Sequence, residues 1–201
     1  MIPSRLVLAT ANAGKTRELR ELLAEWGSLD VQSLADFPDV RLPEEDGATY
    51  AENALLKARA VAAATRLPAL ADDSGLEVDA LAGAPGVRSA RFAPTDAARI
   101  DHLLDALRGA GDRWARFRCD VALAWPDGRT ECEGGVCTGR IAERADGAGG
   151  FGYDPIFVAD ELGRTFAAAT REEKARVSHR ARAVRALGAR LGVRSGPPGI
   201  S

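Results

Sequence analysis

Cysteine and histidine are scarce in this sequence, and the shortage of each excludes a class of chemistry. The 201 residues include three cysteines, which are odd in number and lack C-x-x-C spacing: Cys119, Cys132 and Cys137. This pattern favours reduced, buried thiols in a cytoplasmic protein over a disulfide framework or a zinc site. The two histidines, His102 and His179, form neither a serine–histidine–acid pattern nor zinc-type spacing. Catalysis by a metal ion and carboxylates is therefore easier to support.

Long apolar runs and an excess of basic charge are also missing. The first apolar run, residues 6–9, is far too short for a signal sequence or a membrane span, and no other stretch reaches membrane length without a charge. The formal net charge of -2 argues against a basic sheath for nucleic acid, although one pocket can be basic on an acidic protein. We expect a cytoplasmic protein with no membrane or nucleic-acid partner.

Hydrophobic residues make up 46% of the chain, which is enough to bury one substantial core. Capping-box patterns at Thr49–Glu52 and Thr170–Glu173 predict two helix starts. Apolar periodicity predicts further helices over 15–26, over 96–108 and from 178, and strands over 5–10, 29–34, 69–71, 115–125, 129–139 and 155–158. Strands and helices alternate early and a hairpin follows, so the expected class is α/β with a mixed sheet. We expect one domain in two lobes over residues 1–194 and a flexible tail over 195–201.

The first segment that can carry chemistry is the strand-to-helix loop Thr10–Thr16. Backbone N–H groups at a helix start, with Lys15 beside them, make an anion site through geometry and the helix dipole. Gly14-Lys15-Thr16 invites comparison with a Walker A loop, but Ala9 stands where that motif needs its first glycine. A plain loop with a solvated lysine is the alternative for this segment taken alone.

Acidic residues form the second candidate. Glu44-Glu45-Asp46 precedes Gly47, and a short apolar strand ends in Asp72-Asp73. Adjacent carboxylates after a buried strand repel each other unless a cation or donors compensate, and oxygen-only ligands suit Mg²⁺ with bound phosphate. The glutamates taken alone also fit a solvated loop.

A glycine-rich segment, Gly149-Gly150-Phe151-Gly152-Tyr153-Asp154-Pro155, is the third candidate. Glycines allow a ligand to approach the backbone, and the two aromatic rings offer faces on which a base can stack. A glycine-rich turn with one buried aromatic is the alternative.

The fourth candidate is the charged run from Thr170 to Arg180. It brings Lys174, His179 and Arg180 around a helix start with Ser178 as its expected cap. Donors there can meet a phosphate or a purine carbonyl. A charged helix face is the alternative, as it is for most such runs. His102, in an amphipathic helix, is expected to lie on the surface.

These segments, in this order, resemble the inosine triphosphate pyrophosphatase family, also called XTP/dITP diphosphohydrolases, from Leu6 to about Leu191. The specific pieces are Thr10-x-Asn12-x-x-Lys15, Thr49-x-x-Glu52-Asn53-x-x-x-Lys57-Ala58, Ala71-Asp72-Asp73-Ser74-Gly75-Leu76, Gly83-Ala84-Pro85-Gly86 with Ser89-Ala90-Arg91, the Gly149–Pro155 segment and Ser178-His179-Arg180.

The resemblance implies a two-lobed α/β catalytic domain with its active site in the cleft, a homodimer, and a magnesium-dependent reaction. ITP, dITP and XTP would be cleaved between the α- and β-phosphates to the monophosphate and pyrophosphate, which cleanses the nucleotide pool. Selection for a 6-oxo base would come from a donor on His179 or Arg180, because an unmatched buried donor costs about 1–3 kcal/mol. Guanine shares the 6-oxo group, so its rejection needs a further feature that the sequence does not reveal.

Residue by residue, the resemblance implies that Glu44 and Asp73 bind the metal and that Asp73 accepts the proton of the attacking water. Asp46 stands where the family usually has threonine, so the choice between Glu44 and Glu45 stays open. The implied phosphate contacts are Thr10, Ala11, Asn12, Ala13, Gly14, Lys15, Lys57, Ser74 and Lys174. The implied base contacts are Phe151, Gly152, Tyr153, Asp154, His179 and Arg180.

Two other functions fit parts of the pattern. A related pyrophosphatase for pyrimidine or modified nucleotides would differ in the base-contacting residues. A non-catalytic nucleotide-binding module is disfavoured by Glu44 and Asp73, because a pure binder gains little from carboxylates beside phosphates.

Overall fold

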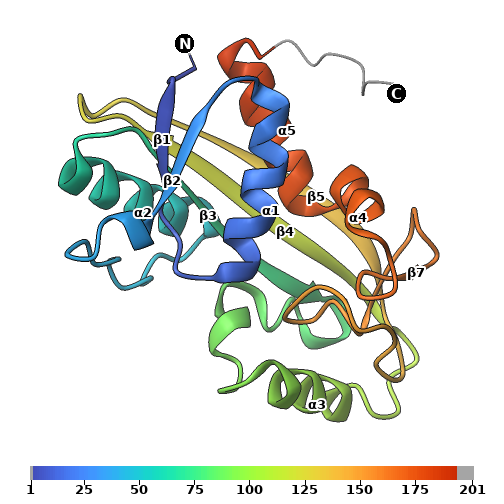
Figure 1. Ribbon diagram of the computed structural model, residues 1–201. Coiled ribbons are helices and arrows are strands. Elements are labelled where there is room, and N and C mark those ends of the chain that lie inside the picture. Colours follow the sequence, from blue (N-terminus) through green and yellow to red (C-terminus); the bar gives the residue numbers. More distant parts are fainter. Residues whose placement is uncertain (1, 194–201) are drawn as a thin grey trace, which may run out of the picture. The chain divides into compact units, whose positions relative to one another are not determined.

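Seven strands form one mixed sheet in the computed structural model, which describes residues 2–193 (Figure 1). Their order in the sheet is β2-β1-β3-β4-β5-β6-β7. Strand β1 pairs in parallel with β2 and β3, whereas β6 pairs antiparallel with β5 and β7. The bounds are β1 Arg5–Leu8, β2 Asp30–Ser33, β3 Ala69–Val78, β4 Trp114–Ala124, β5 Thr130–Ile141, β6 Phe157–Ala159 and β7 Arg164–Thr165. The predicted α/β class with a mixed sheet is confirmed, while the predicted tail over 195–201 lies outside the described residues.

Five α-helices and four short 3₁₀ turns connect the strands within residues 2–193. Each of these helices is too short or too polar to cross a lipid bilayer. The α-helices are α1 Ala13–Leu23, α2 Tyr50–Thr65, α3 Asp96–Ala106, α4 Arg171–Val177 and α5 His179–Leu191. The 3₁₀ turns are η1 Ala24–Trp26, η2 Leu34–Asp36, η3 Asp79–Leu81 and η4 Gly86–Arg91.

Local sequence signals explain most of these boundaries. Both capping boxes form, at the starts of α2 and α4. The apolar residues whose spacing predicts the helix over 15–26, Leu19, Leu22, Leu23 and Trp26, are all buried. The chain leaves η1 at Gly27 with a φ of 95°, a conformation that glycine adopts without strain. In the predicted hairpin, Trp125 N donates to Arg129 O at 2.9 Å across the turn that joins β4 to β5.

Strand β3 corrects one expectation. The sequence predicts that the strand ends at Asp72-Asp73, but β3 continues through both aspartates to Val78. The prediction failed because it treated charge as the end of a strand. Buried strand positions can carry charge when counter-ions are packed against them, and Asp72 is 0% exposed.

The chain divides into two compact units. The first comprises the residues up to Asp73, Asp120–Gly135 and the residues from Arg180 onward. Helix α2 packs its small side chains on one face of the strands, in a cluster that includes Val7, Ala58 and Ala71. Because side chains alternate along a strand, Leu6, Leu8 and Leu70 point to the other face, where Figure 1 shows α1 and α5 side by side.

The second unit comprises Ser74–Cys119 and Val136–His179. Its core is aromatic: the ring centroids of Phe117 and Phe157 lie 4.6 Å apart, and those of Phe157 and Phe166 lie 5.2 Å apart. Leu103 of α3 belongs to the same buried cluster, and His102, one position earlier, is exposed as predicted and stacks on Phe92.

The capping box of α2 gives a stability prediction. Thr49 Oγ1 accepts a hydrogen bond from Glu52 N at 3.2 Å, so Thr49→Ala leaves this donor without its protein partner. We expect the free energy of unfolding to fall by about 1 kcal/mol in chemical denaturation. The matched control Thr49→Ser keeps the acceptor and should lose only a few tenths of that amount. Equal losses in the two variants would contradict the capping role.

Candidate functional site

Strand β1 leads into a polar loop that begins helix α1. Asn12 precedes the first turn, and its side chain accepts a hydrogen bond from Lys15 N at 3.1 Å. Asn12 N donates to Thr10 Oγ1 at 3.2 Å, and Thr16 Oγ1 donates to Asn12 O at 3.1 Å. These bonds fix the loop and set the positive end of the helix dipole beside Lys15, which is the arrangement expected of an anion site.

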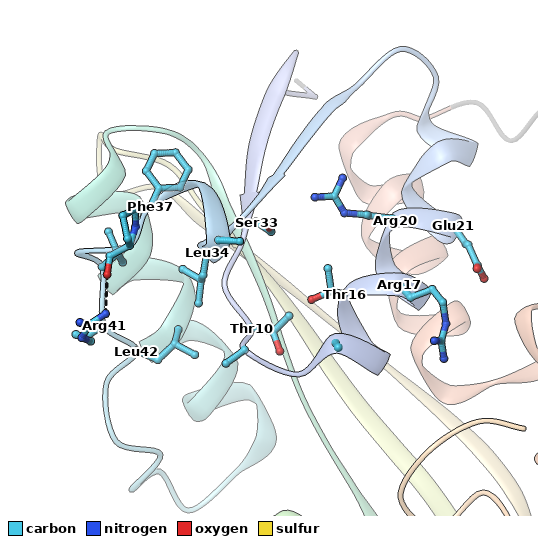
Figure 2. A pocket seen from close by; sticks show the side chains of 15 residues that line it. Thr10, Thr16, Arg17, Arg20, Glu21, Ser33, Leu34, Phe37, Arg41 and Leu42 are labelled. Carbon is cyan, nitrogen blue, oxygen red and sulfur yellow. Dashed lines mark hydrogen bonds between the residues drawn. The ribbon is translucent and has the colours of Figure 1, made fainter.

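A pocket of about 880 Å³ borders this loop. Figure 2 shows Thr10 and Thr16 on its α1 side and Leu34 and Leu42 on the opposite wall, with Arg20 extending from α1 toward Ser33. Three of the predicted phosphate contacts, Thr10, Ala11 and Ala13, line this pocket, whereas Lys15, Lys57 and Asp73 are not among its lining residues.

The two aspartates of β3 point to opposite faces of the strand, as neighbouring strand residues must. Asp72 contacts Lys15 of α1 and Arg180 of α5, whereas Asp73 contacts Asn53 of α2. The alternation separates the two carboxylates that sequence reasoning treated as one pair. Each therefore has its own set of partners.

Asp72 is buried in a network of charged groups. Its Oδ2 atom lies 3.1 Å from Lys15 Nζ and accepts hydrogen bonds from Arg180 Nε at 3.0 Å and Nη2 at 2.9 Å. Arg180 Nη1 also donates to Glu18 Oε2 at 2.5 Å. Burial alone would raise the pKa of Asp72, but Lys15, Arg180 and Lys57 outweigh burial and hold that pKa well below its usual range. Asp72 is therefore a carboxylate anion in the folded protein.

Asp73 has the opposite electrostatic balance. It is 5% exposed, and its Oδ2 accepts a hydrogen bond from Asn53 Nδ2 at 3.0 Å. Burial raises the pKa of Asp73, while Lys57, Lys15 and the Asn53 hydrogen bond lower it and Glu45 adds a smaller increase. The net effect is a raised pKa, which makes Asp73 the more basic of the two carboxylates and the better proton acceptor.

Lys57 connects the acidic loop to β3. Its Nζ donates to the backbone oxygen of Asp72 at 2.8 Å and pairs with Glu45. Glu44, the predicted metal ligand, is exposed, whereas Glu45 is half-buried. Lys15, Lys57, Asp73 and Arg180 are thus brought together within the first unit.

The glycine-rich segment forms a tight turn in the second unit. Gly150 has a φ of 74°, and a Cβ atom there would lie 2.0 Å from Asp154 Oδ2. That same oxygen accepts from Phe151 N at 2.9 Å and pairs with Lys174 Nζ at 2.5 Å. Glycine is therefore required at position 150 by both its backbone conformation and the space available.

Lys174 and the two aromatic residues of this segment have different environments. Lys174 is buried, with Nζ 5.0 Å from the centroid of the half-buried Phe151 ring. Tyr153 is 4% exposed, belongs to the core cluster, and donates its hydroxyl to Ser89 O at 3.1 Å. Burial raises its pKa to about 12. The Tyr153 ring thus packs in the core and the Phe151 ring is the more accessible of the two, while base contact by either residue stays a prediction.

His179 and Arg180 both lie at the start of α5 and both are buried, at 3% and 1% exposure. The His179 ring stacks on Phe117 with centroids 4.6 Å apart in the second unit, whereas Arg180 joins the Asp72 network in the first. Ser74, the remaining predicted contact, is half-buried on β3.

Sequence reasoning gave no role to Asn53 and did not consider Glu18. Asn53 lies one turn before Lys57, on the same face of α2, and this i, i+4 spacing could have identified it. Glu18 lies one turn after Lys15, but its partner Arg180 is 162 residues away, so no local signal joins them.

The structure is an α/β protein in which lysines and an arginine surround buried carboxylates. Comparison with known proteins identifies its family. The Ham1 family model matches residues 6–190. A dITP/XTP pyrophosphatase of Thermus thermophilus is 54% identical over 187 residues, which cover 91% of this chain and 89% of that protein. A solved HAM1 protein from Coxiella burnetii has a TM-score of 0.83 and 42% identity, covering 94% of this chain and 98% of that one. The chain belongs to the Ham1 family, and the resemblance found in the sequence is confirmed.

The crowding at Gly150 gives a prediction with an internal control. Gly150→Ala should force Asp154 away from Phe151 N and Lys174, whereas Gly152→Ala, at a φ of 62° with nothing within 4 Å, meets only backbone strain. We expect Gly152→Ala to lower the free energy of unfolding by about 1–2 kcal/mol and Gly150→Ala to lower it by clearly more. Chemical denaturation of both variants measures the difference, and equal losses would refute the crowding.

Proposed function

We propose that the chain is a Mg²⁺-dependent pyrophosphohydrolase that converts ITP, dITP and XTP to the monophosphate and pyrophosphate, as a homodimer in the cytoplasm. The observation that carries the proposal is the position of Asp73: its carboxylate is 5% exposed and accepts from Asn53 Nδ2 at 3.0 Å, and it adjoins Asp72, which holds both Lys15 and Lys57. A base next to two cations suits hydrolysis of a phosphoanhydride, because the cations hold the phosphates while the base activates water. The name dITP/XTP pyrophosphatase, borne by the Thermus thermophilus relative, points to the same reaction.

The triphosphate is proposed to bind at the start of α1. Residues 10–15 offer N–H groups at the positive end of a helix, and Lys15 and Lys57 add two cations whose positions are fixed by Asp72. Water attacks the α-phosphorus in line with the bond to the leaving oxygen. As that bond breaks, its electron pair departs with pyrophosphate, and the proton of the water passes to Asp73.

Residues 2–193 contain no group of three or more His, Cys, Asp or Glu side chains that could hold a metal ion, so the proposed magnesium ion would take two carboxylates and complete its shell with phosphate oxygens and water. Hard carboxylate oxygens are the protein ligands that Mg²⁺ prefers, and a cation beside Asp73 relieves the electrostatic cost of its burial. Glu45 already has Lys57 as a counter-ion, so we propose that the exposed Glu44 is the second ligand. When bound, the ion would neutralise the negative charge that develops on the phosphates.

The base is proposed to stack on Phe151, whose ring lies beside the Lys174 ammonium group. Tyr153 supports this segment from the core through its hydroxyl group. His179 or Arg180 is proposed to donate to the 6-oxo group of the purine. Adenine presents an amino group there, so it would leave that donor unmatched, at a cost of about 1–3 kcal/mol.

A substrate panel tests this proposal. Pyrophosphate release is measured from dITP, XTP, dATP, dGTP and dTTP, with Mg²⁺ and with EDTA. We expect Mg²⁺-dependent release from dITP and XTP, about tenfold to a hundredfold faster than from dATP. Release of orthophosphate, or equal turnover of all five, would contradict the proposed cleavage site or base selection.

The role of Asp73 is tested by Asp73→Asn, which keeps the size of the side chain and removes its basicity. Turnover of dITP should fall by at least about a hundredfold, because general base catalysis contributes 10²–10⁴-fold. Nucleotide binding, measured by calorimetry, should persist. Asp127→Asn, on the exposed β4–β5 turn, is the matched control and should retain full turnover. Substantial turnover in Asp73→Asn would remove Asp73 from the mechanism.

A further inference from the structure

One atom of Asp72 holds two functional cations. Its Oδ2 lies 3.1 Å from Lys15 Nζ and within 3.0 Å of both Arg180 Nε and Nη2. The three residues come from α1, β3 and α5, and all lie in the first unit. Asp72 was not among the residues predicted to contact the substrate or the metal, yet its side chain touches two that were.

The network around this atom is electrically balanced. Lys15 and Arg180 carry two positive charges, and Asp72 and Glu18 carry two negative ones. Asp72 and Arg180 are 0% and 1% exposed at their side chains, and Lys15 and Glu18 only 15% and 16%, so water screens these charges weakly. Removing one member leaves an uncompensated charge and frees its partner to reorient.

Of the two candidate base donors, His179 and Arg180, we take Arg180, and we propose that Asp72 is a positioning residue that fixes it and the phosphate-binding Lys15 at the same time. The backbone carbonyl of Asp72 also holds Lys57, so the residue orients three cations in all. The inference rests on the proposed function, in which these cations contact the two ends of one nucleotide. Asp72 thereby couples phosphate binding to base selection, while Glu18 accepts a hydrogen bond from Arg180.

The test uses separate readouts for the two ends. Inhibition by inorganic pyrophosphate reports the phosphate end, and the ratio of kcat/KM for dITP to that for dATP reports base selection. In Asp72→Asn, the inhibition constant should rise and the ratio should fall, each by about tenfold or more. A structural role alone would reduce the folded, active fraction, which changes neither quantity.

Glu18→Gln is the matched control, because Glu18 contacts Arg180 and lies on the same helix as Lys15. We expect its selectivity ratio to fall while its pyrophosphate inhibition constant stays within about twofold of the wild type. An unchanged constant and an unchanged ratio in Asp72→Asn would overturn the proposal, as would a change in only one of them.

The double variant Lys15→Gln/Asp72→Asn removes one charge of each sign and serves if Asp72→Asn does not fold. Its inhibition constant should equal that of Lys15→Gln within about twofold, because Lys15 can no longer be mispositioned, while its selectivity ratio should still fall about tenfold. An inhibition constant that combines the effects of both single variants, or a wild-type selectivity ratio, would overturn the coupling.

Failure of the proposed function can be told apart from failure of this inference, because it appears as a wild-type enzyme without activity. Calorimetry of pyrophosphate binding then still compares Asp72→Asn with the wild type.

Discussion

A carboxylate removed from water remains charged only if cations take the place of the solvent. Asp72 is such a carboxylate, so the first unit has to pack cations against it. Lys15 from α1 and Arg180 from α5 supply the cations, and Glu18 balances the excess positive charge. Helices distant in the sequence are thereby tied to the interior strand β3 by directional bonds as well as by apolar packing. The orientation of the lysine at the helix start follows from this network.

Because side chains alternate along β3, its two aspartates face different elements and have different pKa values. Asp72 faces the cations of α1 and α5, and its low pKa makes it a poor base. Asp73 faces α2, where burial outweighs the nearby lysines and Asn53 orients one oxygen. Two adjacent, chemically identical residues thus receive different properties from their surroundings: one organises charge, and the other is suited to accept a proton.

The sequence predicted those features that depend on local spacing. The stripe of Leu19, Leu22 and Leu23 predicted the buried face of α1, and both capping boxes formed. Features set by distant contacts were missed. Arg180 and Asp72 are 108 residues apart, so their ion pair has no local pattern, and β3 continues through charges that these distant partners compensate. The core position of Tyr153 has no local signal either, since its partner Ser89 lies far along the chain.

In the proposed reaction water attacks the α-phosphorus, and an oxygen-isotope experiment locates the point of attack. The enzyme is allowed to hydrolyse dITP in H₂¹⁸O with Mg²⁺, and the products are separated and analysed by mass spectrometry. We expect one ¹⁸O atom in the monophosphate and none in the pyrophosphate. Label in the pyrophosphate would mean attack on the β-phosphorus, and labelled orthophosphate would mean attack on the γ-phosphorus. Either result would contradict the assignment of Lys15, Lys57 and Asp73 to cleavage at the α-position.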